Sequence, residues 1–114
     1  MILLLTFLAF IAFFYNNEVN NETYLKLNDF GLSLQQEFLR GVEVHEGYER
    51  TINIPEEINN REYSISIEKI NDFRSELIIN FKGRDIIIII PAVEGDLSKG
   101  KNILTNKEGV LYIK

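Results

Sequence analysis

A glycine-rich stretch near the C-terminus is the first place where residue spacing suggests chemistry. Residues 95–102, GDLSKGKN, nearly match the phosphate-binding pattern G-x-x-x-x-G-K-[ST]. The pattern needs a hydroxyl that holds a magnesium ion, but Asn102 occupies that position. It must also open a helix, whereas Asn102–Thr105 has the texture of a strand. We therefore expect a polar hairpin loop and no nucleotide site.

Titratable side chains are spaced poorly for catalysis or metal binding. His45 is the sole histidine, and its acidic neighbours Glu43 and Glu46 do not complete a usual ligand set. Glu56 and Glu57 are adjacent in a turn, so their carboxyl groups should diverge rather than act as an acid/base pair. The chain has no cysteine for a thiolate or a disulfide. We expect no enzymatic activity and no cofactor or metal.

One modification signal stands out. Asn21-Glu22-Thr23 is an N-glycosylation sequon, which makes Asn21 a candidate acceptor if this segment is extracytoplasmic. Such sequons also arise by chance in a chain this rich in asparagine.

The charge of the chain limits the classes of partner that it can bind. The chain has 114 residues, which suits one domain, and a net charge of −5. Its lysines and arginines are scattered from Lys26 to Lys114, so the clustered positive surface that nucleic acid requires is missing from the sequence. We expect no nucleic-acid partner.

The N-terminal segment, residues 1–15, has one polar side chain, Thr6. A helix this apolar has no polar face and belongs in lipid or inside a bundle of helices. Fifteen residues rise only about 22 Å, less than the roughly 30 Å hydrocarbon core of a bilayer. Three interpretations stay open: part of a longer apolar helix that begins before Met1, a signal peptide that is removed, or a buried core helix. We favour the first.

Helical spacing returns after the polar residues 16–21, NNEVNN, which could be a weak point or a melted segment of the helix. An apolar stripe follows at intervals of three to four residues, with Leu25, Leu32 and Leu39 as a neighbouring strip. Gly31 lies inside this helix, and Gly41 or Gly47 could end it. The stripe consists of Tyr24, Leu27, Phe30, Leu34, Phe38 and Val42.

Strand patterns fill the remainder, with turns between them. The expected strands are 48–54, 63–67, 77–81, 86–90, 102–105 and 110–113. Ile86–Ile90 is an unbroken apolar run, so we expect both of its faces to be covered. Short turns predict an antiparallel meander, with Phe30, Leu34 and Phe38 packed on the sheet that contains this run.

These elements give an α+β fold in two parts. We expect residues 1–46 to form the N-terminal helix, with 1–15 as the apolar segment for a membrane or a helix bundle and 16–46 as the amphipathic part; residues 47–114 are expected to form a β-rich head. The order and texture resemble archaeal type IV pilin-like proteins, which carry a class III signal peptide. The resemblance includes the helix up to Arg40-Gly41, Gly47–Pro55, Tyr63–Ile67, Ile86–Pro91 and the closing Asn106–Ile113.

The resemblance implies a structural subunit of an extracellular adhesive filament. Its partners would be copies of itself, the membrane before assembly, and the pilus assembly machinery. The filament-core positions would be Leu3, Leu4, Leu5, Phe7, Leu8, Phe10, Ile11, Phe13 and Phe14. The alternative is a monomeric, membrane-tethered extracytoplasmic β-domain that acts as a binding module.

Overall fold

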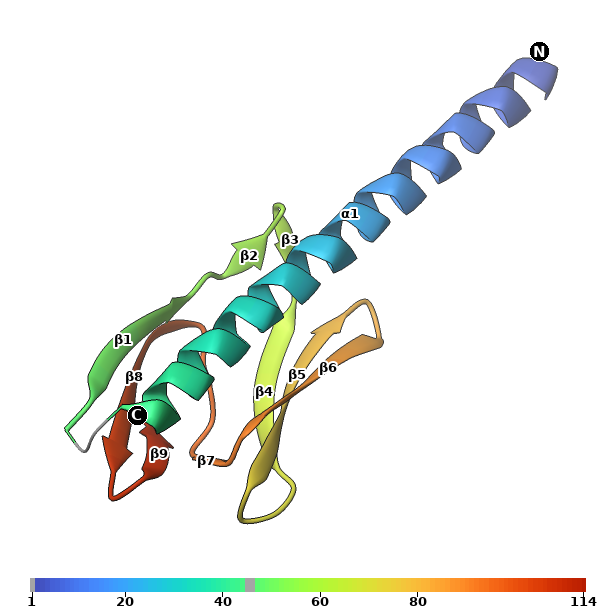
Figure 1. The fold of residues 1–114 in the computed structure, drawn as a ribbon. Helices are drawn as coiled ribbons and strands as arrows, with labels where there is room; N and C mark the ends of the chain where they lie inside the picture. The colour runs from blue at the N-terminus through green and yellow to red at the C-terminus, as the bar shows by residue number, and fades with distance from the viewer. Residues whose placement is uncertain (1, 45–46) are drawn as a thin grey trace.

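The protein combines one long helix with a β-rich head in a computed structural model, which describes residues 2–44 and 47–114, with side chains from Asn20 onward. Helix α1 runs from Ile2 to Glu43. Its first half extends beyond the strands, and the molecule measures 69 × 24 × 17 Å (Figure 1). The expected α+β class is confirmed.

Helix α1 passes unbroken through residues 16–21, so a melted segment there is wrong. Each asparagine lowers helix stability by only a few tenths of a kcal/mol relative to alanine. A break would require a second, unfavourable nucleation step on its far side. Of the two glycines expected to end the helix, Gly41 lies inside it, and the helix ends at Glu43.

Two sheets and a short ribbon form the head. The first sheet has the order β1-β8-β9-β7, the second has the order β4-β5-β6, and β2 pairs with β3. The strands are β1 (Glu49–Ile54), β2 (Glu57–Ile58), β3 (Arg61–Glu62), β4 (Ser64–Lys69), β5 (Arg74–Phe81), β6 (Arg84–Pro91), β7 (Val93–Glu94), β8 (Gly100–Lys107) and β9 (Val110–Ile113).

The expected meander is wrong for the first sheet. Strand β1 pairs with β8, far along the chain, and β7 pairs with β9 in parallel. The local hairpins are as expected, because β5–β6 and β8–β9 are antiparallel neighbours. Their two-residue turns, Lys82-Gly83 and Glu108-Gly109, have positive φ at both positions, as a type I′ turn requires.

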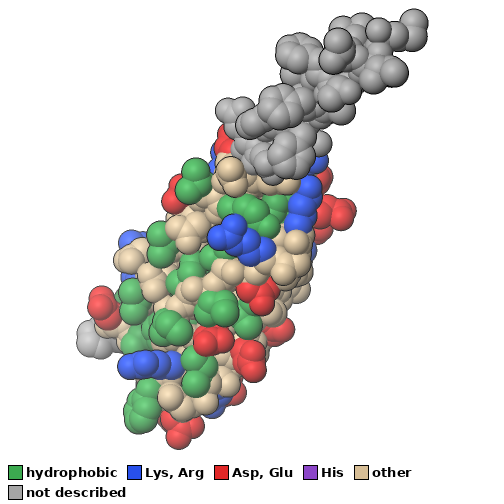
Figure 2. Space-filling model, turned by 90° about the vertical axis from the view of Figure 1, so that its right-hand side faces the viewer, with side chains coloured by type: hydrophobic (Ala, Val, Ile, Leu, Met, Phe, Trp, Pro, Cys, Tyr) green, Lys and Arg blue, Asp and Glu red, His purple; other side chains and the backbone are tan. Residues whose placement is uncertain are grey.

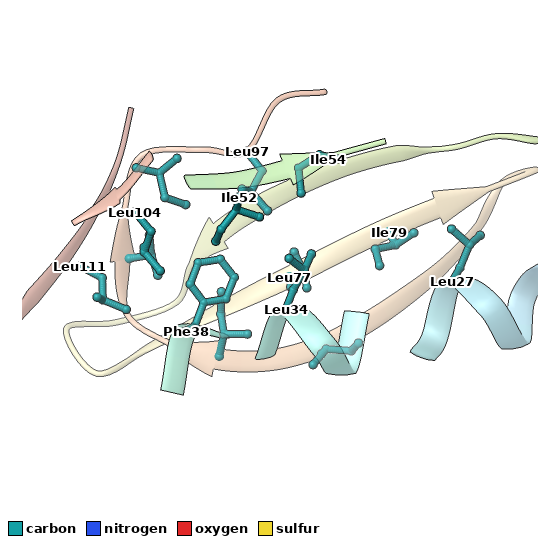
Figure 3. Packing of buried hydrophobic residues seen from close by; sticks show 14 of the residues in the cluster. Leu27, Leu34, Phe38, Ile52, Ile54, Leu77, Ile79, Leu97, Leu104 and Leu111 are labelled. Carbon is teal, nitrogen blue, oxygen red and sulfur yellow. The ribbon is translucent and has the colours of Figure 1, made fainter. Parts of the chain in front are cut away.

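The core lies between α1 and the two sheets (Figure 3). Leu34 and Phe38 of α1 are buried there as expected, and Phe30 is partly buried beside Tyr63. Val42, also placed on this face by its spacing, is exposed. The strands contribute Ile52, Ile54, Leu77, Ile79, Phe81, Ile88, Ile90, Leu104, Leu111 and Ile113.

The isoleucine run of β6 is covered on one face only, contrary to the expectation. Ile88 and Ile90 are buried, whereas Ile87 and Ile89 are exposed. The reason is that α1 packs on one face of the sheet β4-β5-β6, and no other element of the described chain covers Ile87 and Ile89 on the opposite face. Figure 2 shows hydrophobic side chains scattered among charged ones on one face of the head.

Gly31 allows α1 to approach β6 closely. A Cβ atom at this position would overlap Cδ1 of Ile88 and would lie 3.1 Å from Cδ1 of Ile79. The glycine therefore stabilises the packing of helix on sheet, although it weakens the isolated helix.

Candidate functional site

The glycine-rich loop before β8 binds its own groups. The side-chain oxygen of Asn102 accepts a hydrogen bond from the Ser98 amide (3.0 Å), and its amide nitrogen donates to the carbonyls of Ser98 (2.8 Å) and Gly100 (3.1 Å). Asn102 is buried and begins no helix. Its amide thus occupies the centre of the loop, where a phosphate site would need free backbone donors.

Lys99, from the same loop, is directed to the head instead of to a ligand. Its ammonium group donates to the Glu56 carbonyl (2.6 Å) and lies 3.7 Å from the centre of the Tyr63 ring. Burial, with a smaller contribution from Glu56, raises the pKa of Tyr63 to about 12. The Tyr63 hydroxyl donates to the Pro55 carbonyl (2.6 Å), so this group stays protonated and structural.

The acidic candidates do not converge. Glu56 and Glu57 are both exposed, as expected of surface charges. His45 and Glu46 lie outside the described residues. Among the residues that are described, no group of three or more His, Cys, Asp or Glu side chains could hold a metal ion.

The sequon lies on α1, and the head covers its third residue, Thr23. Asn21 is exposed, but Thr23 is fully buried and its hydroxyl accepts a hydrogen bond from the Asn59 side-chain amide (3.0 Å). A glycan on Asn21 would therefore have to be attached before α1 docks on the β2–β3 turn. Glycosylation of Asn21 stays a prediction.

Helix α1 presents two different surfaces along its C-terminal half. Thr23, Leu27, Leu34 and Phe38 face the head and are buried. Leu25, Leu32 and Leu39 form the exposed strip that the sequence placed beside them, with Leu25 68% exposed. The strip leaves an apolar surface on α1 that is not covered by the described part of the head.

Polar contacts that the sequence did not reveal fix α1 on the head. The Tyr24 hydroxyl donates to the Phe81 carbonyl (2.8 Å), and the Gln35 side chain donates to the Ile89 carbonyl (2.7 Å). At the helix end, the buried Asn106 amide donates to the carbonyls of Gly41 (2.8 Å) and Val44 (3.2 Å). Asn106 thus satisfies carbonyls that the end of a helix leaves free.

The positions assigned to the filament core, Leu3 to Phe14, are within the backbone of α1, but their side chains lie outside the described residues. Among the described residues, no helix combines the length and the apolarity that crossing a membrane requires.

No model of a known protein family, no curated protein and no solved structure matches the chain. The resemblance to pilin-like proteins therefore stays a prediction.

Proposed function

We propose that the protein is a structural subunit of an extracellular, archaeal type IV pilus-like filament that serves in surface adhesion. Subunits assemble through residues 1–15 of α1. Before assembly the same segment holds the subunit at the membrane, with the head outside, and the pilus assembly machinery drives its release.

One observation carries the proposal: a single helix of 42 residues joins the apolar segment to the head. Among the helix residues whose side chains are described, from Asn20 onward, the first buried one is Thr23, so the head covers the C-terminal half of the helix. The N-terminal half extends away from the strands (Figure 1). Residues 1–15 have one polar side chain, so this part of the helix needs an apolar surrounding, which copies of the same helix supply.

The transfer of residues 1–15 from the membrane to the filament costs little free energy. Lipid and the interior of a helical bundle are both apolar, so the side chains of residues 1–15 lose little hydrophobic stabilisation on transfer. Packing between helices and contacts between heads then decide the equilibrium. Continuity of α1 lets a pull on the head act directly on the apolar segment.

Phe10→Lys tests the proposal on the full chain in cells. An unpaired charge at an apolar filament axis costs several kcal/mol even after relaxation, and helical symmetry repeats that cost in every subunit. We expect filaments to disappear from electron micrographs, while Phe10→Leu and the surface change Asn53→Lys leave them intact.

Antibody labelling of the same cells separates the two functions considered. Labelled filaments are expected from the unchanged chain. Label spread over the cell surface without filaments would refute the proposal and favour the tethered binding module. Normal filaments from Phe10→Lys would show that residue 10 does not lie at an apolar axis.

A further inference from the structure

The loop between β4 and β5 presents an aromatic side chain to solvent. Phe73 is 84% exposed, and its neighbour Ile70 is half exposed. Asp72, between them, has 92% of its side chain exposed, with a 4.0 Å ion pair to Lys69. Aromatic side chains in such positions are frequent anchors of protein interfaces. We call residues 70–73 the tip.

The backbone of the tip is held in place. The Asn71 side-chain oxygen accepts hydrogen bonds from the amides of Phe73 (2.8 Å) and Arg74 (2.9 Å). The Phe73 carbonyl accepts from the Ala92 amide (3.2 Å), and the Arg74 carbonyl from the Ile70 amide (3.0 Å). Because the tip is already ordered, binding through Phe73 would lose little conformational entropy.

A groove lies at the other end of the head, between α1 and the start of β6. Tyr24, Leu25 and Ile86 give it apolar walls, while Asn21, Asn28, Arg84 and Asp85 form a polar rim. Its volume is about 500 Å³. A cavity of about 150 Å³ already accommodates a benzene ring, so the groove has room for the Phe73 ring and for part of its flanking residues.

We propose that the tip of one copy binds the groove of the next copy, with Phe73 between Tyr24 and Ile86 and Asp72 beside Arg84. The charges match this orientation at Arg84, where the carboxylate beside Phe73 meets a guanidinium. The carboxylate on the same rim, Asp85, already accepts a hydrogen bond from the Asn80 side-chain amide (2.7 Å). Arg84 is exposed and lies 4.9 Å from the centre of the Tyr24 ring; within the described chain it has no ion pair.

The positions of tip and groove make the contact directional. They lie at opposite ends of the β5–β6 hairpin (Figure 1), whose strands have eight residues each. At about 3.3 Å per residue, successive copies are offset by roughly 25 Å. Two different surfaces meet, so the contact is heterologous and can propagate from copy to copy, which gives an open filament wherever the rotation between copies does not close a ring.

This inference deepens the proposed filament function, because it supplies the contact between heads, but it can be tested separately. The chain has no cysteine, so introduced pairs report distances cleanly. Ile70→Cys places a thiol on the tip and keeps Phe73 and Asp72. Asn28→Cys places its partner at the groove rim.

The full chain with both cysteines is oxidised in detergent solution and in harvested filaments, then separated on non-reducing gels. We expect a ladder of covalent multimers, since each copy carries both halves of the contact. Either cysteine alone should stop at dimers. The pair Asn53→Cys with Asn28→Cys, which puts the second thiol on β1 away from the tip, should give no ladder.

Two further changes test the chemistry of the contact. Truncating an interface anchor weakens binding by roughly 30-fold, so Phe73→Ala should slow cross-linking by about that factor, whereas truncation of the exposed Val44 should not. Asp72→Arg and Arg84→Asp should each weaken the contact about two- to fivefold, and the double exchange should restore it.

The outcomes separate this inference from the filament proposal. A ladder in detergent from a chain that never forms filaments supports the head contact and refutes the filament function. Filaments without a ladder above the control pair refute the head contact alone. The Ile70→Cys chain is also treated with a water-soluble thiol reagent in the presence of phosphatidylcholine vesicles. If the vesicles slow labelling of this thiol and no ladder forms, the tip binds a lipid surface and the proposal is overturned.

Discussion

The contact between Gly31 and Ile88 offers a direct test of how α1 is seated on β6. Alanine at position 31 should favour the helix by about 1 kcal/mol over glycine. Its Cβ atom would overlap Ile88 Cδ1, and overpacking of a core costs about 1–3 kcal/mol. We therefore expect Gly31→Ala alone to destabilise the head by roughly 0–2 kcal/mol.

Ile88→Val removes Cδ1 of Ile88, the atom that the new Cβ would overlap, and leaves only the 3.1 Å contact with Cδ1 of Ile79 for the core to absorb. Alone, this change should cost about 0.5–1.5 kcal/mol, as is usual for a buried isoleucine. In the double variant the new Cβ occupies the space that Cδ1 vacates, and the gain in helix stability remains. We expect the double variant to be at least as stable as the unchanged chain, a coupling of about 1–3 kcal/mol.

The coupling is measured from urea unfolding of the four full-length chains in detergent, followed by circular dichroism. Ile87→Val is the matched control, because Ile87 is exposed on the opposite face of β6 and should add independently to Gly31→Ala. Independent sites add within about 0.5 kcal/mol. If Gly31→Ala and Ile88→Val also add within that range, α1 is not seated on Ile88.

Three further predictions concern the packing of α1 on the head and the stability of the head itself. Phe38→Ala, at a fully buried position, should cost about 3–5 kcal/mol, whereas Leu39→Ala on the exposed strip should cost much less; similar melting temperatures would show that α1 does not pack here. Asn106→Ala should cost about 1–3 kcal/mol by freeing carbonyls at the helix end, while Thr105→Val should be neutral or stabilising, since its buried hydroxyl has no partner among the described residues. The pKa of Tyr63 rises from 10.0 in the unfolded chain to about 12 in the folded chain, so its contribution to stability should be full below pH 10 and be lost as the pH rises toward 12. Tyrosinate absorbance measures the titration, and the Tyr63→Phe chain should unfold without this additional loss of stability.

Local patterns predicted the local structure well. The three- to four-residue spacing of apolar side chains placed Leu34 and Phe38 in the core, alternation in residues 63–67 located β4, and the expected strand 77–81 lies within β5. The closing hairpin between strands 102–105 and 110–113 was expected across residues 106–109, and its turn is the shorter Glu108-Gly109, which joins β8 to β9. Each of these features depends on neighbours within a few residues, so the sequence reveals them directly.

Long-range pairing could not be predicted in the same way. The pairing of β1 with β8, and the parallel contact of β7 with β9, depend on where α1 delivers the chain rather than on a local pattern. The two faces of β6 were misjudged for the same reason. A run of isoleucines shows no alternation, so only the packing of α1 on one face of the sheet distinguishes Ile87 from Ile88.

The polar contacts of the candidate site were missed because their partners are backbone carbonyls. Gln35 and Asn106 look like ordinary surface residues in the sequence, yet Gln35 binds the Ile89 carbonyl and Asn106 is buried against the helix end. No spacing rule connects residues 54 or 65 positions apart. The exposed Phe73 was equally hidden, since a lone aromatic residue in a turn has no period.

The fixed orientation of α1 relative to the head affects whether copies of the protein can assemble into a regular filament. Tyr24, Gln35 and Asn106 bind backbone carbonyls along the helix, and they limit its rotation on the sheets. Gly31 sets its distance from β6. A helical assembly needs every head to hold the same orientation to its helix, because an error in one subunit would separate the contacts of the next. A tethered module has no such need and would function on a flexible linker. The fixed junction between α1 and the head therefore weighs toward assembly, and loosening it by Gln35→Ala together with Asn106→Ala should disorder filaments before it unfolds the head.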